Sequence, residues 1–276
     1  MQSISAPVRR LAALSLASTL VACTTVQTTE PGVIGVDRKQ RMSPLVSEAE
    51  LEQGAATAYA QVLAAEREKG KLNTDAAQLA RVRRIAERII PQVAAFRPDA
   101  RGWDWQVNLI ESDQLNAWAM PGGKIAFYSG IIDKLQLKDD EIAAIMGHEI
   151  AHALREHSRE RASEQATTGL VIGIGGAIAG VGGTVSQATQ MVYNTTFGLK
   201  NSRAHETEAD RIGVELAARA GYDPEAAIRV WQKMAKVSGG GGGPEFLSTH
   251  PSNESRIEDL KVYSEKVMPL YRAATS

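Results

Sequence analysis

The stretch His148-Glu149-Ile150-Ala151-His152 lies inside a helical pattern that begins near Lys138 and opens with three acidic residues. Acidic side chains favour the positive end of the helix dipole, so they indicate where this helix starts. Residues four apart share one helical face, so both imidazoles can reach one Zn²⁺ while Glu149 can take a proton from a water on the metal. The spacing therefore predicts a zinc-binding helix with Glu149 as the base. The alternative is a surface helix with two solvated histidines.

Two histidines leave such a site one ligand short, because catalytic zinc takes three protein ligands and keeps one position for water. The metzincin extension of HExxH would supply a third histidine, but the chain has Arg155 and Ser158 where that extension needs Gly and His. His157 would fall about 140° round the helix from His152, so we expect it to be a solvated neighbour. The third ligand is therefore expected further along the chain.

A downstream helix offers carboxylates at helical spacing. Glu206 and Asp210 are four residues apart, and Gly213 and Ala217 continue the same stripe, so this helix can approach the first one closely. We expect Glu206 to complete a His₂Glu site and Asp210 to accept the N–H of a zinc-bound histidine. Glu208 is the fallback ligand, and an acidic solvated face is the alternative for the whole stripe.

Further motifs accompany these two helices. They are Glu-x-Glu-Ala-Asp-Arg-x-Gly at 206–213, Ala-Gly-Tyr-Asp-Pro at 220–224 and Ala-Met-Pro-Gly-Gly at 119–123. Together with HExxH they resemble the M48 family of metallopeptidases, in particular its bacterial periplasmic lipoprotein members, over roughly residues 80 to 260. The resemblance implies one zinc ion per chain, a gluzincin fold, and endoproteolysis of misfolded or envelope proteins.

Two short motifs near the C-terminus extend this resemblance. Thr-His-Pro at 249–251 and Ser-Arg-Ile at 255–257 are similar to a late motif of the family, in which a histidine and an arginine approach the active-site cleft. We expect His250 or Arg256 to stabilise the oxyanion formed during peptide hydrolysis. For His250 the alternative is a turn histidine that precedes a proline.

The remaining pattern predicts an α+β fold that is mainly helical, with a small mixed sheet beside the HExxH helix, as in zincin-like metalloproteases. Only 5% of the residues are aromatic, so the core should consist largely of helices packed through small side chains. Residues 103–111 alternate with period two, and two short strands are expected around the turn at 121–123. Helices are expected over 47–65, 74–90, 202–220, from 223 onward, and from about 253 to 263 or beyond.

The strand before the turn is the expected substrate-binding surface. It comprises Asn116, Ala117, Trp118, Ala119 and Met120, and the proline that follows suits an edge position. An edge strand can pair with an extended peptide through main-chain hydrogen bonds, which demands little of the peptide's sequence. We therefore expect unfolded or misfolded proteins and peptides as substrates. The alternative is a zinc-stabilised chaperone or assembly factor for outer-membrane proteins that binds them without proteolysis.

Residues 1–22 have the pattern of a secretory signal peptide, because two arginines precede an apolar stretch that is too short to span a bilayer. The stretch ends in Leu-Val-Ala-Cys at 20–23, which resembles the bacterial lipobox. We therefore expect Cys23, the single cysteine of the chain, to carry a lipid. Thr24 stands where an inner-membrane retention signal would place Asp, so the resemblance implies an anchor in the outer membrane, facing the periplasm.

Two segments are expected to lie outside the regular fold. Residues 23–45 are rich in Thr, Val, Gly and Pro, which predicts a lipidated N-terminus followed by a flexible tether, and residues 46–276 form the expected peptidase domain. The glycine-rich run at 169–185 is too short for a membrane helix, which needs roughly 20 residues. We expect a closely packed pair of helices there, or a mobile cover over the site, rather than membrane contact.

The overall charge of the chain is close to neutral. Its formal net charge at pH 7 is -1, from 31 basic and 32 acidic side chains. Nucleic-acid-binding domains are normally strongly basic on one face. We therefore expect no nucleic-acid partner.

Overall fold

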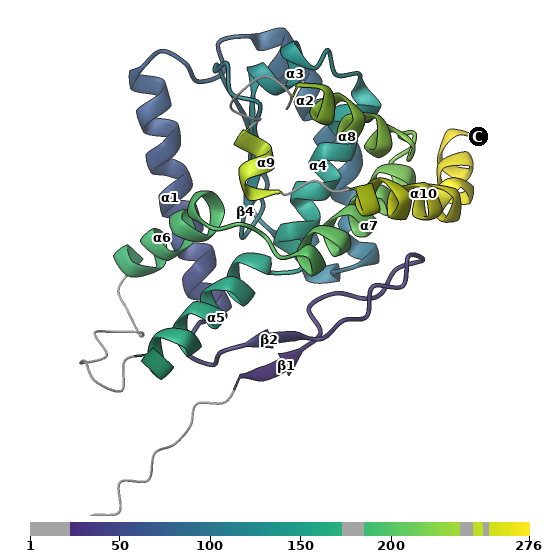
Figure 1. Cartoon of the computed structure of the whole chain (residues 1–276). Coiled ribbons are helices and arrows are strands. Elements are labelled where there is room, and N and C mark those ends of the chain that lie inside the picture. The colour runs from purple at the N-terminus through teal and green to yellow at the C-terminus, as the bar shows by residue number, and fades with distance from the viewer. Residues whose placement is uncertain (1–22, 173–184, 238–244, 251–253) are drawn as a thin grey trace, which may run out of the picture.

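The computed structural model describes residues 23–172, 185–237, 245–250 and 254–276 (Figure 1). The expected signal peptide and residues 173–184 of the glycine-rich run lie outside the described residues. Helices make up most of the described part, and a small mixed sheet lies beside them. This confirms the α+β, mainly helical fold class predicted from the sequence.

The mixed sheet has three strands in the order β3-β5-β4. β3 (Gln106–Ile110) runs parallel to β5 (Lys124–Tyr128), whereas β4 (Ala117–Met120) pairs with β5 in the antiparallel direction. The turn between β4 and β5 requires glycine, because Gly122 and Gly123 have φ angles of 73° and 81°. Because the strand order is β3-β5-β4, β4 lies at an edge of the sheet within the described chain, as the sequence predicts.

Two long helices precede the sheet. α1 (Glu48–Glu68) begins after Ser47, whose hydroxyl accepts a hydrogen bond from the backbone N–H of Glu50, and α2 (Ala76–Ile89) begins after Asp75 in the same way. Both caps follow from short polar side chains that precede an apolar helical pattern. Shorter helical segments lie at η1 (Ile90–Ala95), η2 (Pro98–Gly102) and α3 (Ser129–Lys134).

α4 (Asp139–Leu154) lies at the centre of the fold and carries the HExxH motif. All its side chains from residue 141 to 154 are buried. It packs side by side with α7 (Arg203–Arg219), and the two backbones meet at Gly147 and Gly213 (Figure 1). A Cβ added to Gly213 would lie 2.6 Å from the backbone nitrogen of His148. The stripe of small residues on α7 therefore permits the close approach that the sequence predicts.

The chain on either side of the glycine-rich run forms α5 (His157–Ile172) and α6 (Val185–Tyr193), and a π-helical turn, η4 (Asn194–Gly198), follows. α6 packs tightly on α1, where a Cβ added to Gly54 would lie 2.6 Å from the backbone of Ala188. The helix pair or mobile cover expected over residues 169–185 falls largely on residues 173–184, which lie outside the described residues.

Three C-terminal helices complete the described fold: α8 (Ala226–Val237), α9 (Glu245–Thr249) and α10 (Glu254–Thr275). α8 packs on α4, and α10 packs on α7. The short helix α9 was not predicted (Figure 1), and His250, the residue directly after it, is buried. Among the helices in the described ranges, none is both long enough and apolar enough to cross a bilayer.

The N-terminal segment differs from the flexible tether that was expected. Residues 24–46, which we call the N-terminal strap, contain two paired strands, β1 (Thr24–Val26) and β2 (Gln40–Met42), and β2 lies along α5. Ile34 in the strap is 1% exposed. Its glycines form turns that fold the strap back onto the domain, and Gly32, with φ of 63°, lies against the ring of Phe96. The buried apolar residues of the strap follow no regular period, so periodicity could not reveal their burial.

Candidate metal centre

Two imidazoles of α4 face one point across a single helical turn. Nε2 of His148 lies 3.1 Å from Nε2 of His152, because the spacing of four residues puts both rings on the same face. Both side chains are buried. Burial lowers the pKa of His152 well below its usual value, so the ring is neutral and can offer a lone pair to a cation.

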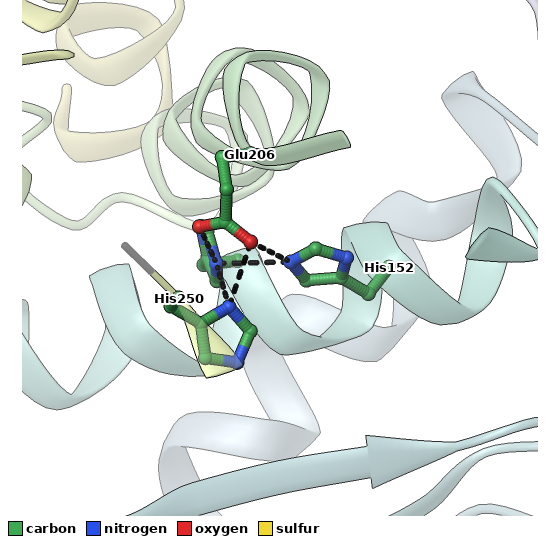
Figure 2. A group of neighbouring side chains, drawn as sticks. His152, Glu206 and His250 are labelled. Atoms are coloured by element: carbon green, nitrogen blue, oxygen red, sulfur yellow. Dashed lines mark hydrogen bonds and ion pairs between the residues drawn. The ribbon is translucent and has the colours of Figure 1, made fainter. Parts of the chain in front are cut away.

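α7 brings the carboxylate of Glu206 to the same point (Figure 2). Its oxygens lie 3.4 Å from Nε2 of His152 and 3.6 Å from Nε2 of His148. Burial opposes ionisation of Glu206, but the charge of His250, contacts with the side chains of His152 and His250, and the Arg256 guanidinium hold its pKa well below the usual range. The carboxylate is therefore charged and suited to bind a cation.

His250 enters this cluster from the end of α9. Its Nδ1 lies 2.9 Å from the carboxylate of Glu206 and 3.2 Å from Nε2 of His148 (Figure 2). Its Nε2 lies 3.5 Å from the carboxylate of Glu149. Burial alone would lower the pKa of His250, but the two carboxylates outweigh it and raise the pKa. The structure thus places His250 among the candidate metal ligands rather than in a peripheral turn.

The geometry of this cluster fits one divalent ion. One ligand atom from each of His148, His152, Glu206 and His250 can be chosen so that all lie within 4.8 Å of one another. Zinc bonds of about 2.0 to 2.1 Å at tetrahedral angles put ligand atoms about 3.3 Å apart. The separations from 2.9 to 3.6 Å lie around that value. In the part of the chain that the structure describes, no other group of such side chains has this arrangement.

Asp210 supports the ligands from one turn further along α7. Its Oδ1 lies 3.0 Å from Nδ1 of His148, the contact that the spacing on α7 predicts. Arg256 donates to both oxygens of Asp210 at 2.7 Å and lies 2.6 Å from Glu206. Burial would raise the pKa of Asp210, but the Arg256 guanidinium and the histidine lower it overall. These contacts make Arg256 a partner of the site's carboxylates and do not favour the oxyanion role that was expected of it.

Glu149 lies between the cluster and the edge strand. A hydrogen bond from the backbone of Ala119 in β4 reaches its carboxylate. Burial is the largest influence on Glu149 and raises its pKa. A general base works best when its pKa is near the working pH, because it must both accept and return a proton. Burial therefore adjusts this carboxylate toward general-base chemistry.

A recess lies between the cluster and β4. Four of the five predicted substrate residues line it, namely Asn116, Ala117, Trp118 and Ala119. Met120 is fully buried and is not among the lining residues. Glu149 and two candidate metal ligands, His152 and His250, also line this recess. The predicted edge strand and the predicted metal centre thus share one cleft.

His157 also contacts the metal centre, and the expectation that it is solvated is wrong. Its side chain is 0% exposed, and its Nδ1 lies 2.7 Å from Nδ1 of His152. The physical reason is that α4 ends at Leu154 and the chain turns at Glu156, where φ is 50°. A helical wheel drawn from the HExxH motif therefore does not extend to His157. The available signal was the end of the apolar pattern at Leu154.

A chain of hydrogen bonds leads from His152 to the N-terminal strap. Nε2 of His152 faces the cluster, so its Nδ1–H donates to His157, whose Nε2–H donates to Glu208 at 3.1 Å. Burial lowers the pKa of His157 well below its usual value, which agrees with this neutral form. Glu208, the fallback ligand, is outside the cluster and instead pairs with Arg155 at 2.8 Å and with Arg38 of the strap. The strap thereby reaches a residue that positions a candidate metal ligand.

Comparison with known proteins agrees with this geometry. The sequence model of Peptidase family M48 matches residues 76–264. The chain is similar to the mitochondrial metalloendopeptidase OMA1 of Saccharomyces cerevisiae, at 32% identity over 177 residues, which covers 62% of this chain and 50% of that protein. It is also similar to the β-barrel assembly-enhancing proteases of Yersinia pestis (31% over 175 residues, covering 58% and 35%) and Escherichia coli K12 (28% over 172 residues, covering 59% and 35%). The chain thus spans half or less of the length of these relatives.

Proposed function

The chain belongs to peptidase family M48, and from that premise we propose that it is a zinc-dependent endopeptidase whose metal is held by His148, His152 and Glu206. The observation that carries this proposal is the convergence of two imidazoles and one carboxylate, from two separate helices, on a point beside Glu149. Imidazole and carboxylate ligands at tetrahedral spacing suit zinc, and they leave a fourth position for chemistry.

The residues around the cluster have separate parts in the proposed hydrolysis. The metal ion, when bound, supplies Lewis-acid polarisation in the cleft. Glu149 accepts a proton from the attacking water and returns it to the leaving amine, a task that suits its raised pKa. Asp210 accepts the Nδ1–H of His148 and so keeps the Nε2 lone pair directed at the metal position. An extended substrate adds to the edge of β4 through main-chain hydrogen bonds, which supports a broad range of unfolded substrates.

His250 requires a conformational step in this mechanism. With its Nδ1 at the fourth corner of the cluster, no corner is left for water. The proposal therefore includes withdrawal of His250 before a substrate is cleaved. An oxyanion-stabilising role for His250 would require the same movement, because the imidazole must leave the corner before it can face a reacting carbonyl.

The proposed setting is the periplasm, with the chain anchored in the outer membrane through a lipid on Cys23. The lipobox-like sequence at 20–23 supports this. Two bacterial relatives carry names that connect them with β-barrel assembly, which supports envelope proteins as substrates. Other relatives are mitochondrial, so the proposed location rests on the N-terminal motif rather than on the family.

Cleavage of casein by the purified zinc-loaded protein tests the proposed function. Cleavage should stop with a chelator and return with zinc. Glu149→Gln should keep zinc and lose cleavage, because an amide cannot take the proton, whereas Glu258→Gln, at an exposed carboxylate on α10, should keep both. Full activity of Glu149→Gln would refute the assignment of the base. If neither wild type nor His250→Ala cuts casein but both prevent aggregation of an unfolded protein, the chaperone alternative is favoured.

A further inference from the structure

The side chain of Arg161, on α5, lines the same recess as Glu149 and His152. It is 8% exposed, so its guanidinium is largely removed from water. Nη2 donates to the backbone carbonyl of Thr195 at 2.6 Å. Nε and Nη1 are buried and have no hydrogen-bond partner within the protein. Two nitrogens of a charged guanidinium are therefore left without an acceptor at the wall of the proposed substrate cleft.

The other buried arginines in the described ranges are all paired with carboxylates. Arg155 lies 2.8 Å from Glu208, Arg256 lies 2.7 Å from Asp210, and Arg97 lies 2.9 Å from Glu156. Arg161 makes no such ion pair with any described residue. Burial lowers the pKa of Arg161 to about 10, so the group stays charged at neutral pH. A charge that is buried without a partner is costly, so a ligand that brings the opposite charge is strongly favoured at this position.

Other lining groups of the recess also lack hydrogen-bond partners within the protein. They include Oε1 of Glu149, Oγ1 of Thr196 and Oδ1 of Asn201. Buried polar atoms in folded proteins are nearly always satisfied, so a concentration of unsatisfied donors and acceptors along one recess indicates where a polar ligand binds. A peptide backbone offers both the N–H and the C=O groups that these atoms require. It offers no negative charge for Arg161.

We propose that Arg161 forms a carboxylate-binding subsite, so that the enzyme prefers substrates that carry a carboxylate close to the scissile bond. A carboxylate supplies both the charge and the acceptor oxygens that the two unpaired nitrogens lack, and hydrogen bonds between charged partners are about twice as strong as neutral ones. The carboxylate belongs either to an acidic side chain or to the free C-terminus of the substrate. This subsite defines the substrate class of the proposed peptidase and therefore rests on that function.

The experiment compares internally quenched peptides that differ in one group, with the zinc-loaded wild type. In the first arm, Glu is exchanged for its neutral isostere Gln at each position near the cleaved bond. In the second arm, a free C-terminal carboxylate is exchanged for a carboxamide. We expect kcat/KM to be about 10- to 100-fold higher for the carboxylate at one position in one arm, which identifies the source of the charge.

Variants of Arg161 test whether this side chain causes the preference. Arg161→Gln should bring the carboxylate-to-amide ratio to about one, and Arg161→Lys should keep part of the preference because it retains the charge without the planar guanidinium. Arg159→Gln is the matched control on the same helix, because Arg159 pairs with Glu156 and does not line the recess. It should keep the wild-type ratio.

Each outcome separates this inference from the proposed function. A wild type that cuts casein but shows a ratio near one in both arms overturns the subsite and leaves the peptidase standing. A preference that persists in Arg161→Gln assigns the recognition to another group and also overturns the inference. If neither wild type nor His250→Ala cuts casein, the proposed function fails first and the subsite fails with it. If Arg161→Gln does not fold, the carboxylate-to-amide ratio of kcat/KM measured with the wild type decides whether the subsite stands.

Discussion

Replacing Gly213 by alanine should separate the two helices that hold the proposed metal. The new Cβ would lie 2.6 Å from the backbone nitrogen of His148, whereas ordinary contacts begin at 3.4 Å, so the helices must move apart by about 3.4 - 2.6 = 0.8 Å. Metal-ligand distances tolerate changes of only about 0.2 Å. Overpacking costs about 1 to 3 kcal/mol, and the better helix propensity of alanine offsets about 1 kcal/mol of it. We expect a net loss of about 0 to 2 kcal/mol in unfolding free energy and zinc binding weakened by at least about tenfold.

Zinc affinity can be measured by competition with a chromophoric chelator, and stability by thermal unfolding of the metal-free protein. The matched control is Gly102→Ala, because a Cβ at Gly102 meets no atom within 4 Å and its backbone needs no positive φ. The control should keep the affinity and the melting temperature of the wild type. If Gly213→Ala instead binds zinc normally and melts at a higher temperature, as an unconstrained helical glycine would, then the contact between α4 and α7 does not set the geometry of the metal centre.

Three further changes test the parts of the site that lie around this contact. His157→Gln should weaken zinc binding by about 10- to 100-fold, because it removes the acceptor for Nδ1–H of His152. The melting temperature of the metal-free protein should change little. Unchanged zinc affinity in the chelator assay would contradict the positioning role of His157. His250→Ala should raise the basal rate of casein cleavage by opening the fourth corner of the cluster, and a lower rate in the same assay would instead favour the oxyanion role. Arg38→Gln should destabilise the metal-free protein most near neutral pH. Burial opposes ionisation of Glu160, but hydrogen bonds from Arg38 and His205 hold the pKa of Glu160 well below its usual value. The stability that the ionised Glu160 contributes is therefore present above the unfolded pKa of about 4.3 and is lost as the pH falls toward the folded pKa. Urea unfolding at several pH values should show the difference between wild type and variant shrinking in acid, and a constant difference would argue against the linkage.

The parts of the site that follow from one helix could be predicted from the sequence. The fourfold spacing on α4 places both histidines, and the spacing on α7 places Asp210 next to His148 and Gly213 at the helix contact. These predictions need only helical geometry and the rule that catalytic zinc takes three protein ligands. The capped starts of α1 and α2 were predictable for the same local reason, because a short polar side chain satisfies the first free N–H groups of a helix.

The parts that depend on where a helix ends could not be predicted in this way. A helical wheel that continues past Leu154, where α4 stops, places His157 at the surface, whereas the chain turns there and buries it. The Pro and Gly residues of the strap are equally typical of turns and of linkers, so they predict a tether as readily as the paired strands that form. His250 reaches the cluster from α9, a helix of five residues that is too short for a periodic signal. The positions of His157, the N-terminal strap and His250 are thus fixed by tertiary packing rather than by local sequence pattern.

The two faces of α7 explain why the strap, which precedes the residues matched by the family, has a part in the site. One face presents Glu206 to the cluster and Gly213 to the backbone of α4. The other face presents Glu208 to Arg38 and Glu215 to the backbone N–H of Ile34, both in the strap. A helix held from only one side can rotate about its axis, and a rotation would move Glu206 away from the histidines. The strap contacts on the opposite face resist that rotation, so the orientation of the third proposed ligand depends on both sets of contacts together.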